Sequence, residues 1–235
     1  MCSSDLYVTN VRTGNRLYKN NGNGQFTDIS KRSGTDVRAH SAGSTFFDYD
    51  RDGLLDLYVS NVGVYTTDEL SNVTVYTNQG QVVTDEQYYV GFKDAFAGHL
   101  KKERTENSVL FKNLGNNRFK DVTEEVELID SGWSGDAVVI DGNGDGWPDL
   151  YVINMQGNDE YYENLEGKKF LRKSREIFPK TSWGAMGVTS LDFDNDGDMD
   201  IFVTDMHSDM AEKLDVDREK EKMQARYPES FLKTR

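Results

Sequence analysis

The sequence predicts an all-β fold of repeated four-stranded sheets, the architecture of a β-propeller. Three observations support this prediction. An acidic motif begins at Asp48, Asp141 and Asp192, and the last two copies are 51 residues apart. An apolar run such as DLYV follows each copy. Paired short runs around a turn rich in Asn and Gly recur further along the chain. A complete repeat therefore contains about four short strands, which is typical of a propeller blade.

The repeats divide the chain into the parts of one incomplete propeller domain over residues 1–235. DLYVTN near the N-terminus matches DLYVSN of the first acidic repeat, which indicates a copy without its front half. A blade with only two strands would leave an open edge, so we expect the natural chain to continue past Arg235. The expected parts are a partial blade at 5–30, blades at 39–123 and 133–175, and a partial blade at 183–205.

Two segments fall outside the repeat. Residues 62–106 interrupt the first complete blade with mixed aromatic and charged residues, and we expect a long loop that decorates one face. The end of this insertion, HLKKERTE, has a composition that favours helix. Residues 208–226 carry a few apolar residues among dense charges, which predicts a solvent-exposed helical insertion near the C-terminus.

The composition limits the classes of partner. The 235 residues include 36% hydrophobic and 11% aromatic residues, which is enough to fill a core. The formal net charge of −14 argues against nucleic acid and anionic membrane surfaces as partners, because both would repel such a protein. No apolar run reaches the length of a transmembrane helix, so we expect no membrane insertion.

The acidic motif predicts a metal site in each of three repeats. In the first copy, acidic side chains occupy positions 1, 3, 5 and 9, with Gly53 at position 6. Such a group of carboxylates repels itself unless a cation lies among them. Ligands that are all oxygen, together with a backbone carbonyl at position 7, suit Ca²⁺ best. The predicted ligands are Asp48, Asp50, Asp52, Leu54 and Asp56; Asp141, Asn143, Asp145, Trp147 and Asp149; and Asp192, Asp194, Asp196, Asp198 and Asp200.

Other interpretations of the acidic motif are weaker. A single Asp–Gly-rich stretch is explained equally well as a hairpin turn with solvated charges. Three copies in register, with acids where a turn needs only glycine, favour metal binding. An EF-hand requires glutamate at position 12, where this chain has Val59, Val152 and Val203. Three histidines and one cysteine without a recognisable spacing give no zinc site.

The motif D-x-D-x-D-G-x-x-D-L, followed by a strand and a hairpin, resembles the FG-GAP and VCBS repeats of integrin α-subunit propellers and bacterial surface proteins. The resemblance covers residues 5 to about 205. The segments AFAGHLKKERTENSVLFKN, WSGDAVVIDGNGDGWPDLYVINMQG and VTDMHSDM are similar to the cartilage-acidic-protein and UnbV-type (ASPIC) branch. This resemblance implies a propeller of about seven blades, of which the chain supplies about four, and a secreted or cell-surface protein.

Three residues at the entry to the first strand of each blade are candidates for a second site. His40, Trp133 and Trp183 lie eight or nine residues before the first aspartate of their loops. They could form a rim around a pocket for a sugar or peptide, but we favour packing between blades. His207 could join a site with Asp205 and Asp209, although an isolated surface histidine is the simpler interpretation.

These observations favour a calcium-binding scaffold for adhesion or for binding a protein or carbohydrate, rather than an enzyme. The sequence has no G-x-S-x-G motif and no cysteine beside a histidine. The alternative is a calcium-dependent lyase or hydrolase that acts on polysaccharides. Loops of this kind bind calcium in the 10⁻⁴ to 10⁻³ M range of extracellular modules, which would leave them empty in most cytosols. We therefore expect a secreted, periplasmic or cell-surface protein.

Overall fold

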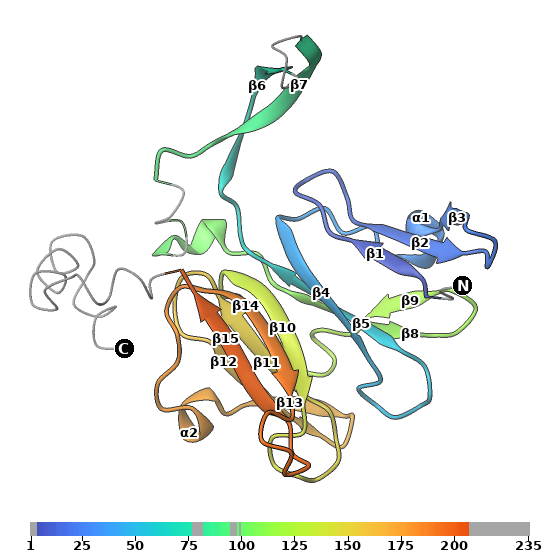
Figure 1. Ribbon diagram of the computed structural model, residues 1–235, viewed down its shortest axis with the longest axis vertical. Helices are drawn as coiled ribbons and strands as arrows, with labels where there is room; N and C mark the ends of the chain where they lie inside the picture. Colours follow the sequence, from blue (N-terminus) through green and yellow to red (C-terminus); the bar gives the residue numbers. More distant parts are fainter. Residues whose placement is uncertain (1–3, 77–81, 95–97, 99, 207–235) are drawn as a thin grey trace, which may run out of the picture.

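The structure is a computed structural model that describes residues 4–76, 82–94, 98 and 100–206. It confirms the predicted all-β fold class (Figure 1). Two four-stranded antiparallel sheets have their strands in sequence order, apart from the insertion between β5 and β8. The first contains β4 (Ser41–Phe47), β5 (Asp56–Asn61), β8 (Val109–Asn113) and β9 (Phe119–Asp121). The second contains β10 (Ser134–Ile140), β11 (Asp149–Asn154), β12 (Glu160–Leu165) and β13 (Lys169–Arg172).

Two smaller sheets flank this pair. The N-terminal sheet has three strands and the C-terminal sheet has two, and no closed ring of sheets forms within the described residues. The predicted helical segment 208–226 lies outside the described residues. Strands β1 (Leu6–Val8), β2 (Arg16–Asn20) and β3 (Phe26–Asp28) form the N-terminal sheet, and β14 (Ala185–Leu191) and β15 (Asp200–Asp205) form the C-terminal one.

Successive sheets meet along their first strands, as the blades of a propeller do. Strand β10 contacts both β4 and β14, and the three strands lie side by side (Figure 1). The hydroxyl of Thr45 in β4 donates a hydrogen bond of 2.8 Å to the carbonyl of Ala137 in β10. The approach requires glycine at position 43, because a Cβ there would lie 2.5 Å from Oδ1 of Asp136.

The main hydrophobic core lies between the two four-stranded sheets. It combines Tyr58 and Leu110 from one sheet with Leu150, Val152 and others from the next. Leu110, Leu150 and Val152 are fully buried. Each side chain of this size contributes about 1.5–3 kcal/mol when it is removed from water. The sheets therefore stabilise one another, since none could cover its own apolar face.

Asp130 joins the same two sheets by hydrogen bonds. Its Oδ2 accepts from the hydroxyls of Tyr58 at 3.0 Å, Ser108 at 2.6 Å and Ser134 at 2.6 Å. Tyr162 of the second sheet donates to the other oxygen at 3.3 Å. The carboxylate is 1% exposed, and its four donors offset the cost of burying the charge.

The insertion at 62–106 differs from the sequence prediction. Instead of a long loop, it forms a β-hairpin of β6 (Thr66–Tyr76) and β7 (Val82–Gly91), which projects away from the sheets (Figure 1). The helical composition of HLKKERTE is also misleading, since its described residues form no α-helix and only 3₁₀ turns, at Leu100 and at Lys102–Arg104. The alternation of polar and apolar residues in ELSNVTVY is the strand signal that explains the difference.

Short helical turns follow the last strand of two sheets. Helix α1 (Ser30–Ser33) follows β3, and α2 (Ser174–Ile177) follows β13. No helix among the described residues is long and apolar enough to cross a membrane.

Candidate metal centres

The three acidic loops connect the first and second strands of their sheets and lie at the end of the sheets opposite the hairpin (Figure 1). In the first loop, Asp48 accepts the backbone N–H of Asp52 at 3.1 Å and of Gly53 at 2.9 Å. The aspartates at position 1 of the other two loops accept the same pair of N–H groups, at 3.1 and 2.8 Å for Asp141 and at 3.1 Å each for Asp192. The motif therefore folds in the same way each time.

Left-handed backbone at two positions explains why the motif contains glycine. Position 6 has φ of +85° at Gly53, +81° at Gly146 and +97° at Gly197. Glycine adopts this conformation without steric cost. Position 4 is also left-handed, at Arg51, Gly144 and Asn195, with φ of 57°, 71° and 63°. Arginine is an uncommon residue in this conformation, so the loop imposes it.

The aspartate at position 9 ties each loop to its sheet. Asp56 is fully buried and accepts the N–H of Tyr49 at 3.1 Å and of Asn113 at 2.7 Å. Burial is the largest effect on its ionisation and raises the pKa of Asp56 to about 6. Burial also raises the pKa of the equivalent Asp149. A cation beside either carboxylate would favour the charged form.

Carboxylate oxygens converge in the first and third loops. In the first, Asp48, Asp50 and Asp56 each offer one oxygen, and these atoms lie within 4.8 Å of one another. Asp192, Asp194 and Asp200 form the equivalent group in the third loop. These six are predicted ligands that the structure brings together.

The second loop differs because position 3 is an amide. Asn143 accepts the N–H of Asp145 at 3.0 Å and donates to its carboxylate at 2.9 Å. In all three loops the carboxylate at position 5 accepts the N–H of position 7, at 2.8 to 2.9 Å. This bond fixes the backbone of Leu54, Trp147 and Asp198, whose carbonyls are the remaining predicted ligands.

The first loop has a cationic neighbour that the sequence analysis missed. The ammonium of Lys112 in β8 contacts Oδ2 of Asp50 and lies 3.3 Å from Oδ2 of Asp52. The other oxygen of Asp50 is buried and has no hydrogen-bond partner among the described residues. A buried carboxylate oxygen without a donor is unfavourable. The residues of this loop therefore fit a bound cation.

The first two loops also contact each other. The guanidinium carbon of Arg51 lies 4.5 Å from the ring centre of Trp147 in the second loop. Asn164 of the second sheet donates to the carbonyl of Tyr49 in the first loop at 2.8 Å. Gly167, in the turn between β12 and β13, lies directly against the first loop. A Cβ at this position would lie 2.7 Å from the Cα of Asp50.

Two of the three candidate rim residues, His40 and Trp133, pack against the insertion. His40 is 3% exposed; Nδ1 lies 3.0 Å from Glu106 Oε2 and Nε2 lies 2.8 Å from Thr66 Oγ1. Trp133 is also buried, and a Cβ at Gly98 would lie 2.4 Å from its ring. These contacts are with the insertion, whereas we expected packing between blades, so that interpretation of the rim stays a prediction.

Two of the candidate rim residues line open cavities. A cavity of about 630 Å³ is lined by His40, Thr66 and Glu106 together with Arg12 and Phe92. Trp183 is half-buried and lines a smaller cavity of about 300 Å³. His207 lies outside the described residues.

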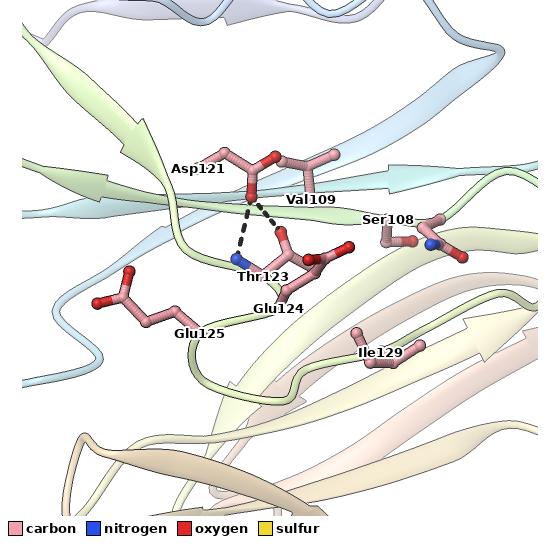
Figure 2. A pocket seen from close by; sticks show the side chains of 8 residues that line it. Ser108, Val109, Asp121, Thr123, Glu124, Glu125 and Ile129 are labelled. Carbon is pink, nitrogen blue, oxygen red and sulfur yellow. Dashed lines mark hydrogen bonds between the residues drawn. The ribbon is translucent and has the colours of Figure 1, made fainter.

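Another cavity, of about 620 Å³, lies beside β8 and β9 and has acidic walls (Figure 2). Asp121 uses its carboxylate to turn the chain, because Oδ1 accepts the N–H of Thr123 at 3.0 Å and its hydroxyl at 2.7 Å. Asp28 accepts from Ser30 in the same way after β3. Asp121 therefore has the same structural role as Asp28, which is to hold the turn after the last strand of its sheet.

Comparison with known proteins agrees with this architecture. A family model described as FG-GAP-like repeat matches residues 2–59 and 141–203, together just over half of the chain. Cartilage acidic protein 1 of Xenopus tropicalis is 37% identical over 60 residues, which cover 25% of this chain. The matched segment spans only 9% of that protein's length. The chain belongs to the family of proteins with FG-GAP-like repeats.

Proposed function

We propose that the chain is a calcium-binding extracellular scaffold in which Ca²⁺ stabilises the loops between the first and second strands of three sheets. The observation that carries this proposal is the convergence of Asp48, Asp50 and Asp56 within 4.8 Å, with an equivalent group in the third loop. Such convergence is unfavourable without a cation. Oxygen ligands in a loop of this length are typical of calcium.

Calcium would act on stability rather than on a reaction. Each loop closes a hairpin whose strands contribute to the core between sheets. Binding to the folded state alone stabilises a protein by about 2.7 kcal/mol for each site when the ion is present at 100 times its dissociation constant. We therefore expect calcium to act as a structural ion.

The opposite end of the sheets offers the surface for a ligand. It carries the β6–β7 hairpin and the cavity beside His40. The base of the hairpin is held by Arg12, which contacts Asp68 and lies 4.2 Å from the ring centre of Tyr89. A rigidly held projection beside a cavity favours binding of a protein or carbohydrate ligand.

The FG-GAP-like repeats and the similarity to cartilage acidic protein 1 support an extracellular, non-enzymatic role. The alternative is a calcium-dependent enzyme that cleaves polysaccharides. The arrangement closest to catalytic geometry is the series Glu106, His40 and Thr66. Because both ring nitrogens of the buried histidine hold the insertion, we assign this series to packing. Release of an unsaturated product from uronic-acid polymers, abolished by His40→Ala, would overturn that assignment.

Calcium binding is tested by titration calorimetry on the purified chain after removal of bound metal. We expect about three ions with dissociation constants near 10⁻⁴ to 10⁻³ M, and no competition by equal Mg²⁺. Asp48→Ala and Asp192→Ala should each remove one ion, while Asp121→Asn, outside the loops, should remove none. A wild-type chain that binds no calcium would contradict the proposal.

A further inference from the structure

The first acidic loop contains a positive charge of its own. Lys112 contacts Asp50 and lies 3.3 Å from a carboxylate oxygen of Asp52. The side chain of Asp50 is 14% exposed and that of Lys112 is 29% exposed, so the contact is partly screened from water. The ammonium also lies 6.0 Å from the ring centre of Tyr49. It therefore neutralises part of the charge that a bound ion would otherwise neutralise.

The next blade has no such lysine. Asn113 and Asn164 are equivalent, because each donates its N–H to the aspartate at position 9 of its loop. The residue before each asparagine is therefore also equivalent, and it is Lys112 in one sheet and Glu163 in the other. Glu163 pairs with Lys173 at 2.7 Å. Among the described residues, no lysine or arginine pairs with the acids of the second or third loop.

We infer that Lys112 is an internal competitor of the metal, so that calcium enters the first loop only by displacing this ammonium from Asp50. The inference rests on the proposed function, because it concerns the regulation of one of the calcium sites. An ammonium and a metal ion beside the same carboxylate repel each other strongly, even when each faces a different oxygen. Lys112 therefore weakens calcium binding to the first loop relative to the same loop without the lysine.

Lys112 also explains how the loop survives at low calcium. With the lysine in place, Asp50 and Asp52 have a counter-charge, and only one oxygen of Asp50 has no partner. The loop thus has two alternative cations, one supplied by the protein and one by the solution. A partly exposed ion pair is worth up to about 1 kcal/mol, which sets the expected effect near fivefold in affinity.

The first experiment measures calcium binding to the first loop alone by calorimetry. Asp141→Ala and Asp192→Ala disable the other two loops, and Lys112→Met is added to that background. We expect Lys112→Met to tighten calcium binding about fivefold. The matched control is Lys19→Met, because Lys19 has the same place in the N-terminal sheet, whose described residues include no acidic loop. Equal affinities with and without Lys112 would overturn the inference.

A second measurement uses the unmodified protein and does not depend on the stability of variants. An acylating reagent labels lysines in the presence and absence of Ca²⁺, and mass spectrometry gives the rate at each site. Calcium should raise the rate at Lys112 several-fold because the ammonium is expelled into solvent. Lys120, whose side chain is 56% exposed, should not change. An unchanged Lys112 rate while calcium binds the first loop would overturn the inference, whereas absence of calcium binding to any loop would instead refute the proposed function.

Discussion

The first and third acidic loops have the same backbone but different surroundings. Both have left-handed residues at positions 4 and 6, and both place three carboxylates within 4.8 Å. The first loop packs against the next sheet, where Arg51 meets Trp147, and against β8 of its own sheet, where Lys112 meets Asp50. In the third, Phe193 is 74% exposed and Met199 is 52% exposed. The motif thus determines the local fold, while the neighbouring blade determines burial and a later strand of the same blade determines charge.

The strands that follow the two kinds of loop show the same contrast. Every residue of β5 and β11 is buried, whereas β15 alternates between exposed and half-buried residues. The difference arises because the central sheets are covered on both faces by neighbours. Within the described residues, β14 and β15 have a neighbour on one face only. Stability should therefore decrease from the central sheets towards β15.

The largest expected effect of this gradient is on the free energy of unfolding when equivalent core residues of two sheets are replaced. Leu150 in β11 is fully buried, and Ile201 holds the same place in β15 but is only half-buried. We expect Leu150→Ala to lower the free energy of unfolding by about 4 kcal/mol, because it leaves a cavity, and Ile201→Ala to lower it by about 1 kcal/mol. Urea denaturation in excess calcium measures both. Equal losses would show that the C-terminal sheet is covered as well as the central ones.

A second test contrasts a buried acid of the central blades with an acid of the insertion. Asp159 is fully buried, and burial is the largest effect on its pKa, which it raises. Hydrogen bonds from Asn154 and Tyr151 lower the pKa by less, so that the pKa of Asp159 is raised to about 6. The unfolded chain loses this proton at a lower pH, so the folded state binds more protons between about pH 4 and 6. The contribution to unfolding free energy therefore falls by about 3 kcal/mol as pH rises through that window.

The substitution Asp159→Asn should remove this dependence, which is read from unfolding curves at several pH values. Asp94 should show the opposite sign. Side-chain hydrogen bonds from Lys101 and Arg104 lower the pKa of Asp94 to about 2. Its stabilising effect is therefore present at neutral pH and is lost as pH falls from about 4 to about 2. If Asp159→Asn leaves the pH dependence unchanged, Asp159 is not the titrating group.

A smaller test compares the two loops directly. Asp48 and Asp192 accept the same two backbone N–H groups. We expect Asp48→Ala to lower stability in calcium by about 2 kcal/mol and Asp192→Ala by less than about 1 kcal/mol, because Ile201 and Val203, which follow the third loop, are only partly buried in their core. Thermal denaturation of both variants beside wild type measures the difference. A larger loss for Asp192→Ala would reverse the gradient.

The repeated parts of the fold could be predicted because the relevant signals are local. Gly53, Gly146 and Gly197 mark the left-handed turn within the motif itself, and the following DLYV-type run is a strand in each case. The hairpin at 66–91 was missed because its length and charged residues resemble a loop. Its alternating pattern was present, but no repeat drew attention to it.

Contacts between distant segments, within a blade or between blades, could not be predicted from the motif. Lys112 lies 62 residues from Asp50 in the sequence, and only the register of β5 with β8 brings it to the first loop. The four hydroxyl donors to Asp130 come from separate segments in the same way. The identity of a residue at such a position indicates the charge of its side chain but not which residue it contacts. The contact depends on how neighbouring strands and sheets align.

The central claim, that calcium holds the acidic loops, is tested most directly by thermal denaturation in excess Ca²⁺ and in EGTA with Mg²⁺. We predict a calcium-specific rise in melting temperature of about 5 °C or more, reduced in Asp50→Ala and Asp194→Ala. Equal melting temperatures in the two buffers, with no calcium found by elemental analysis, would show that the loops are solvated turns and would contradict the claim.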